Sequence, residues 1–238
     1  FLELDARSGG KYEHIYFLDA NFFVNARRAV AIAEALQGAK PGTTFSFATR
    51  ANQVVKGRPY LQRLRDLGLR SIEIGIESGS DAALVRFAKD VTAAQNGEAL
   101  NILRELGIKL GLDFIMFDAE ASVGDLRQNL EFFAGYDLDT HIPWESYFNY
   151  MTPYLGTAIR GHYERLLGTT FPIDTLPEPR SLILDPGTRR IFDEFHRLCS
   201  TVGDMATAVT TLETVCLEPL SERERARRLM NAVSLRRY

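Results

Sequence analysis

The sequence predicts an α/β fold built on a parallel sheet, and three observations lead to it. Five segments with strand character alternate with helical segments through residue 148. No hairpin turn signal joins two of the strands, so the chain needs crossover connections, which make strands parallel. The strands also end in polar residues, as strands do at the ligand-binding edge of a parallel barrel.

The strands are predicted from the alternation of polar and apolar residues. The clearest runs from Ser71 to Ile76 and leads directly into Glu77, Ser78 and two nearby glycines. A carboxylate and a hydroxyl therefore stand at the carboxyl end of a half-buried strand. The remaining strands are expected at residues 14–19, 45–50, 109–117 and 140–148.

Helices are expected where apolar residues recur at helical spacing, and Gly68 and Gly107 end two of them. These helices cover residues 26–37, 60–67, 93–106 and 123–133. After residue 150 an irregular stretch is marked by Pro172, Pro177, Pro179 and Pro186, and helical segments follow near 188–202, 204–216 and 221–235. We therefore expect a barrel-like portion at 1–157 and a mostly helical region at 158–238.

Composition narrows the class of protein. An apolar fraction of 45% and a charged fraction of 25% are typical of a globular domain. The net charge of −3 argues against a nucleic-acid or anionic membrane partner. No apolar run reaches the roughly 18 residues that span a bilayer. Cys199 and Cys216 lack metal-ligand spacing, and the first residues are acidic, so we expect a cytoplasmic protein.

Candidate ligand-binding residues are the polar side chains at the strand ends. Arg50 could hold a carboxylate through two hydrogen bonds, and Asp19 or Glu77 could hold an ammonium group. Ser78 could bond a ribose hydroxyl. An amino acid joined to a nucleoside would fit this set of groups. The candidates from the strand ends are Asp19, Asn21, Arg50, Glu77, Ser78 and Glu120.

Four runs of the sequence, together with Lys89 and Thr92, resemble the radical S-adenosylmethionine (SAM) superfamily. The runs are residues 16–22, 50–52, 74–80 and 114–118. They are most similar to the branch whose members often carry a cobalamin-binding domain. The resemblance implies a partial, parallel (β/α)6 TIM-like barrel in which the five strands here are the second to the sixth, with a helical C-terminal extension.

The same resemblance implies cofactors and an activity. An enzyme of this kind uses a [4Fe-4S] cluster to cleave SAM reductively and start radical chemistry, such as cobalamin-dependent methylation or rearrangement. Its expected partners are a small-molecule or peptide substrate and a reductant protein. Ile115 and Glu120 match a Gly-x-Ile-x-Gly-x-x-Glu pattern of the superfamily's fifth strand, whereas Asp113 and Phe117 replace its glycines. Ile115 therefore joins the candidate SAM-binding residues.

One departure from the superfamily is large, because its Cys-x3-Cys-x2-Cys loop is absent. Cys199 and Cys216 lie far downstream on expected helices. The chain also begins without Met, and we interpret it as a fragment whose cluster loop lies upstream. We expect these residues alone to hold no cluster and to be inactive, since such clusters require thiolates.

Two other functions stay open. A degenerate barrel without a cluster could serve as a binding or regulatory domain. An unrelated α/β-barrel lyase could use Glu77 or Glu120 as a general base.

Overall fold

The structure is a computed structural model that describes residues 2–138, 149–198 and 201. Its internal contacts divide the chain into two units, Phe1–Met151 and Thr152–Tyr238. The boundary expected after residue 157 differs from this division by a few residues. Thr157 lies inside the second unit, where its side chain caps the start of α7 (Ala158–Leu167).

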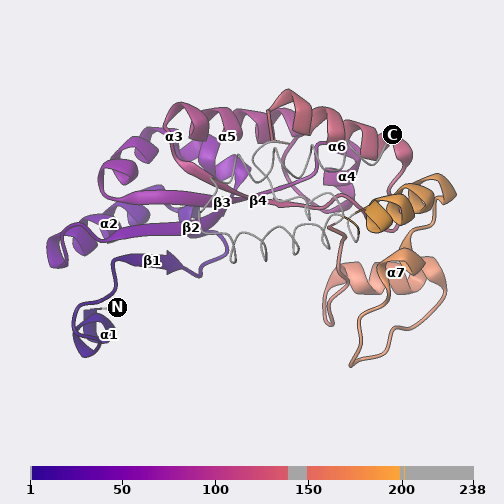
Figure 1. Ribbon diagram of the computed structural model, residues 1–238, viewed down its shortest axis with the longest axis horizontal. Helices are drawn as coiled ribbons and strands as arrows, with labels where there is room; N and C mark the ends of the chain where they lie inside the picture. Colours follow the sequence, from indigo (N-terminus) through magenta and orange to yellow (C-terminus); the bar gives the residue numbers. More distant parts are fainter. Residues whose placement is uncertain (1, 139–148, 199–200, 202–238) are drawn as a thin grey trace, which may run out of the picture. The chain divides into compact units, whose positions relative to one another are not determined.

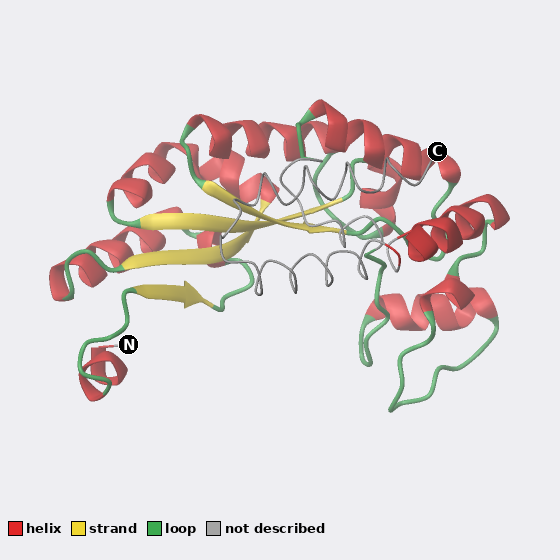
Figure 2. Cartoon of the chain, viewed as in Figure 1, coloured by secondary structure: helices red, strands yellow, loops and turns green. Residues whose placement is uncertain are grey.

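Unit 1 contains a parallel four-stranded sheet. Its strands are β1 (His14–Phe17), β2 (Thr44–Arg50), β3 (Leu69–Glu77) and β4 (Lys109–Phe114), in the order β1-β2-β3-β4 (Figure 2). The α/β class and the parallel pairing predicted from the sequence are thereby confirmed. The strand expected at 140–148 lies outside the described residues. An isolated parallel bridge joins Phe117 to Tyr150.

Four helices make the main crossovers and flanks of this sheet. They are α2 (Ala26–Ala39), α3 (Ala51–Asp66), α5 (Ala93–Glu105) and α6 (Val123–Gly135). Capping boxes begin two of them, with Thr92 and Gln95 at α5 and Ser122 and Asp125 at α6. Shorter helical segments are α1 (Leu2–Arg7), η1 (Phe22–Val24) and α4 (Asp81–Arg86).

The sequence prediction for helix α3 was wrong at its start, which was expected at residue 60. The structure begins it at Ala51 and carries it through Pro59. A proline inside a helix removes a hydrogen bond and crowds the preceding turn, so it predicts a break. Here burial outweighs that cost, because residues spaced three or four apart form one continuous buried stripe. They are Ala51, Val54, Gly57, Leu61 and Leu64.

The alternation of β3 separates an apolar face from a polar face. Ile72, Ile74 and Ile76 are fully buried, and α3 contacts both β2 and β3. Figure 1 shows α3 and α5 running along one side of the sheet. The residues that alternate with the isoleucines lie on the opposite face; they are Ser71, Glu73, Gly75 and Glu77.

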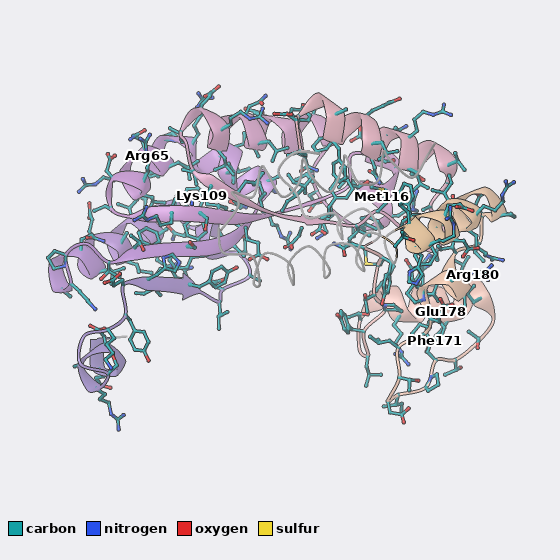
Figure 3. All side chains as sticks on the ribbon, viewed as in Figure 1. Arg65, Lys109, Met116, Phe171, Glu178 and Arg180 are labelled. Atoms are coloured by element: carbon teal, nitrogen blue, oxygen red, sulfur yellow. The ribbon has the colours of Figure 1, made fainter. Side chains whose placement is uncertain are left out.

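Unit 2 is organised around one buried arginine. Arg160 of α7 is 5% exposed, donates to the carbonyl oxygens of Phe171 and Pro172 at 2.7 Å each, and stacks over the Phe171 ring. A short helix, α8 (Pro179–Leu182), follows, and residues 186–198 are helical where a helix near 188–202 was expected. Figure 3 labels Phe171, Glu178 and Arg180 in this unit. The helices expected at 204–216 and 221–235 lie outside the described residues.

In the part of the chain that the structure describes, no helix has both the length and the apolar character to cross a membrane.

The loop after β3 packs directly on α6 through a glycine. A Cβ atom added to Gly79 would lie 2.3 Å from the Cβ of Phe132, close to the helix backbone. Gly79→Ala should therefore lower the free energy of unfolding by about 1–3 kcal/mol, because the loop must move away from α6. The control is Gly135→Ala in α6, since nothing lies within 4 Å of a Cβ atom added to Gly135. Urea unfolding that gives equal stabilities for both variants would contradict the close approach.

Candidate functional site

The carboxyl ends of the four parallel strands lie at one edge of the sheet. Asp19 follows β1, Arg50 ends β2, Glu77 ends β3, and residues 115–120 follow β4. In Figure 3, Lys109 marks the amino edge of β4 and Met116 lies beyond its carboxyl end. Chain topology alone therefore brings the predicted residues to the same edge.

A row of three residues crosses the polar face at this edge. Arg50 of β2 is in register with Gly75 of β3, which is in register with Asp113 of β4. Gly75 leaves the middle of the row without a side chain, and the Glu77 carboxylate fills the space. A Cβ atom on Gly75 would lie 2.9 Å from Glu77 Oε1. The row thus presents a guanidinium, a carboxylate over a glycine, and a second carboxyl group.

Glu77 occupies an unusual backbone conformation. Its φ is +64°, in the left-handed region that costs most residues other than glycine about 1–2 kcal/mol. The β3–β4 register shifts between Gly75 and Glu77, and the Glu77 carbonyl accepts the Ile115 N–H at 2.7 Å. Lys89 Nζ lies 2.6 Å from Glu77 Oε1, and the Glu77 side chain is 15% exposed. Strained residues of this kind cluster at functional sites.

Further acidic groups line the same face below this row. Tyr16 donates a short hydrogen bond to Glu73 Oε2, and this bond is the main cause that raises the pKa of Tyr16 to about 12. Partial burial, followed by the negative charges of Glu73 and Glu77, raises the pKa of Asp113 to about 6. The face therefore carries a carboxyl group that changes its charge near neutral pH.

Ser78 has its side chain in the interior. It is 0% exposed, and its hydroxyl donates to Asn129 Oδ1 at 2.8 Å. The same Asn129 oxygen accepts the N–H of Gly79 at 2.8 Å, and Asn96 donates to the carbonyls of Ile76 and Ser78. The Ser78 hydroxyl thus fixes the loop after β3 to α6.

A second buried network ties that loop to the loop after β4. Arg86 Nη2 lies 2.8 Å from Asp118 Oδ2 and 3.2 Å from Asp125 Oδ2. Burial alone would raise the pKa of Asp125, but hydrogen bonds from Ser80 and Ser122, together with the charge of Arg86, lower it. One guanidinium therefore holds two carboxylates from different elements, and through them both strand-end loops.

The other predicted residues are placed as follows. Asp19 is exposed, and its Oδ2 pairs with Arg28 at 3.2 Å. The Asn21 side chain accepts a hydrogen bond from Thr49 at 2.9 Å.

Ile115 is half-buried beside the Glu77 backbone. Glu120 is exposed, and its N–H donates to Asp118 at 2.8 Å. The structure thus brings Arg50 and Glu77 onto one face, while Ser78 turns inward.

Sequence reasoning missed Glu73, Asp113, Tyr16 and Lys89 as neighbours of Glu77. Glu73 could have been predicted from the sequence. It precedes Gly75 by two residues and Glu77 by four, so the period-two pattern of a strand places it on their face. Asp113 was noted only as a replacement for a glycine. The nearness of Lys89 depends on how the chain turns after α4, which no local pattern specifies.

A cavity of about 340 Å³ lies at the other, amino end of the strands. Its lining includes Lys40, Gly42, Thr43 and Arg70. Across the described ranges no group of three or more His, Cys, Asp or Glu side chains is arranged to hold a metal ion.

Removing the partly buried Arg86 cation tests the network between the loops. Arg86→Met leaves Asp118 and Asp125 without their counter-charge, so the free energy of unfolding should fall by about 3 kcal/mol. The control is Arg58→Met, which removes an exposed pair with Glu105 and should change stability by less than about 1 kcal/mol. Similar urea-unfolding losses in both variants would count against the network.

The pKa of Asp113 gives stability a defined pH dependence. A carboxyl group whose folded pKa is raised stabilises the fold fully below its ordinary pKa of 3.8 and loses that contribution as pH rises through about 6. With allowance for solvent screening, this loss is on the order of 1 kcal/mol between pH 4 and 7. Asp113→Asn should abolish it in unfolding measurements at those two values.

A residue with the opposite shift provides the control for that measurement. The hydrogen bond from Arg180 lowers the pKa of Asp193, so its contribution is present at neutral pH and lost on acidification. Asp193→Asn should therefore change the pH dependence in the other direction. Equal pH profiles for wild type and Asp113→Asn would show that Asp113 titrates normally.

Comparison with known proteins identifies relatives in sequence. No family model matches the chain. It is 35% identical over 136 residues to the 4′-phospho-dehydrooxetanocin synthase of Priestia megaterium, covering 50% of this chain and 18% of that protein. It is 26% identical over 101 residues to the hopanoid C-3 methylase of Methylococcus capsulatus, covering 42% of this chain and 20% of the relative. The chain thus spans about a fifth of the length of these relatives.

Comparison with solved structures concerns the fold. The cobalamin-dependent S-adenosylmethionine radical enzyme OxsB, solved with aqua-cobalamin and S-adenosylmethionine bound, superposes with a TM-score of 0.71 at 21% identity. The match covers 98% of this chain and 40% of OxsB. In fold this chain is thus similar to a cobalamin-dependent radical SAM enzyme, and the resemblance to the radical SAM superfamily predicted from its strand-end motifs is confirmed.

Proposed function

We propose that this chain is the SAM-binding portion of a radical SAM enzyme. In this proposal the parallel sheet continues into a partial (β/α)6 barrel, of which β1 to β4 are the second to the fifth strands. Residues 1–157 form the barrel portion, and residues 158–238 form a helical extension. The fold and the sequence relatives support this function over a domain that has lost its cofactors.

The observation that carries the proposal is the row of Arg50, Gly75 and Asp113 with the Glu77 carboxylate over the glycine. SAM carries an α-carboxylate and an α-ammonium group. Arg50 forms no ion pair with any described residue and can accept the carboxylate in a bidentate pair. Glu77 can hold the ammonium group, and the absence of a side chain at Gly75 leaves room for the Glu77 carboxylate over the strand.

The remaining predicted residues surround this centre. Asp19 and Asn21 follow β1 at the same edge, where they can bond the polar parts of the ligand. Ile115 offers apolar contact for the nucleoside, and Glu120 offers a carboxylate from the loop after β4. Ser78 contributes by fixing the loop, since its hydroxyl is bonded to Asn129.

When bound, SAM and the [4Fe-4S] cluster supply the radical chemistry of the superfamily, with cobalamin as a further cofactor in this branch. The thiolates that hold the cluster are not assigned to this chain, which has only Cys199 and Cys216. The task of the described residues is to bind and orient the ligand at the sheet edge. The substrate is a small molecule or peptide, and a reductant protein supplies electrons.

A lyase with Glu77 as general base has less support. Lys89 Nζ lies 2.6 Å from Glu77 Oε1, so one oxygen of that carboxylate is already engaged in an ion pair. The ion pair is more consistent with a binding group than with a base.

Calorimetry of SAM binding tests the proposal on the intact protein, purified without oxygen. Arg50→Ala should weaken binding by about 1.5–3 kcal/mol, because it removes a charge-assisted hydrogen-bonded pair. Arg58→Ala removes an arginine from the exposed side of the following helix and is expected to bind like wild type.

The two ways of failing have different meanings. No SAM binding by the wild-type protein would overturn the proposed function. Equal affinities for wild type and Arg50→Ala would instead remove Arg50 from the site.

A further inference from the structure

The amino edge of the sheet holds a cavity that the proposed function does not use. It measures about 340 Å³, at the small end of the roughly 300–1,000 Å³ that is typical of small-molecule sites. Its walls come from the loop before β1, the loop before β2 and the start of β3. Figure 1 shows α1 and the end of α2 beside these strand starts. The cavity therefore lies at the opposite end of the strands from Arg50 and Glu77.

Two polar side chains fix the walls of this cavity. Lys40 Nζ donates to Asp5 Oδ2 at 2.7 Å and to two carbonyl oxygens of the loop before β1. Gln37 Nε2 donates to the carbonyl oxygens of Thr43 and Leu67, at 2.6 and 2.8 Å. The three donors of the Lys40 ammonium group thus meet three acceptors, and Asp5 balances its charge. The walls are held by the protein itself, before any ligand binds.

Arg70 reaches the cavity through an irregularity in β3. Phe45 of β2 pairs with Leu69 of β3. The next pair joins Ser46 to Ser71, which leaves Arg70 without a partner in β2. An extra residue of this kind stands outside the ladder, and its side chain is redirected. Arg70 is exposed, lines the cavity and forms no ion pair or side-chain hydrogen bond with the described residues.

Two further polar groups of the lining are also unengaged. The Glu13 carboxylate is exposed and pairs with no described residue, although the Glu13 carbonyl accepts the N–H of Thr44 at 2.9 Å. Thr43 is 2% exposed, and its hydroxyl oxygen has no hydrogen-bond partner in the described part of the chain. Buried hydroxyl groups are normally bonded. The Thr43 hydroxyl is therefore a second observation, independent of the charges, that points to a ligand.

The charges of the lining identify the chemistry of that ligand. Arg70 and Glu13 line the same space without forming an ion pair with each other, while Lys40 is already paired with Asp5. One unpaired cation and one unpaired anion suit a molecule that carries both charges and is neutral overall. A guanidinium binds a carboxylate through two parallel hydrogen bonds, and a carboxylate accepts from an ammonium group.

We propose that this cavity binds a free α-amino acid in its zwitterionic form. Arg70 takes the carboxylate of the amino acid, and Glu13 takes its ammonium group. The Thr43 hydroxyl gives the ligand a neutral hydrogen bond and gains the partner that the protein does not supply. The inference goes beyond the proposed function and does not depend on it, since it uses the other edge of the sheet.

Calorimetry on the intact protein tests the ligand class, with L-alanine, L-methionine and L-glutamate as probes. At least one of them should bind with a Kd on the order of 0.1–1 mM. Acetate and methylamine carry one charge each and should bind at least about tenfold more weakly. The inference is overturned if none of the three amino acids binds, or if acetate binds as tightly as the best of them.

Variants locate the binding. Arg70→Met should weaken binding of the best probe by about tenfold or more. Arg65→Met removes an exposed arginine of α3 outside the lining and should bind like wild type. Arg50→Ala should also leave this affinity unchanged. An amino acid whose binding is lost in Arg50→Ala and kept in Arg70→Met binds at the carboxyl edge instead, which would overturn the inference.

Thr43→Val adds a measurement that needs no ligand. Replacing an unbonded buried hydroxyl by a methyl group removes no hydrogen bond, so the free energy of unfolding of the ligand-free protein should stay the same or rise. Binding of the best amino acid should weaken by about fivefold. A lower stability of Thr43→Val in urea unfolding would overturn the inference, because the hydroxyl would then already be bonded within the protein.

Discussion

The period-two alternation of β3 is the constraint on which the rest of unit 1 depends. Because successive side chains point to opposite faces, Ile72, Ile74 and Ile76 pack under the helices only if the residues between them face the other way. Burial of three isoleucines therefore fixes the orientation of Glu73 and Gly75. The burial of the apolar side chains that stabilises the core also places the polar side chains on the opposite face of the sheet, and no separate interaction is needed to put them there.

Orientation of a strand does not fix the loops beyond it, and here a second kind of interaction acts. Ser78 with Asn129, and Arg86 with two aspartates, join the loops after β3 and β4 to α6 through buried hydrogen bonds. Such networks are costly when incomplete, so they favour one arrangement of the loops. These hydrogen bonds therefore support the candidate site on the side of α6, whereas Arg50 is exposed to solvent.

Much of this architecture could be predicted from local sequence patterns. Alternation and glycine stops located the four described strands and helices α2, α5 and α6, because these signals act within a few residues. The predicted start of α3 was wrong. Pro59 is a local signal for a helix break, but burial of one face of the helix outweighs it. Arg50 and Glu77 could be proposed from strand ends alone. The inward turn of Ser78 and the approach of Lys89 depend on partners 51 and 12 positions away, which no local pattern reveals.

The shifted register between Gly75 and Glu77 has a consequence for how this chain can change in length. The shift places Ile76 and Glu77 where β4 supplies only Phe114 for pairing. A deletion of one residue here would exchange the two faces for everything that follows, turning a carboxylate toward the packed core and an isoleucine toward solvent. Substitutions along β3 can be absorbed one at a time, but an insertion or deletion at this point would lose the site and the core together.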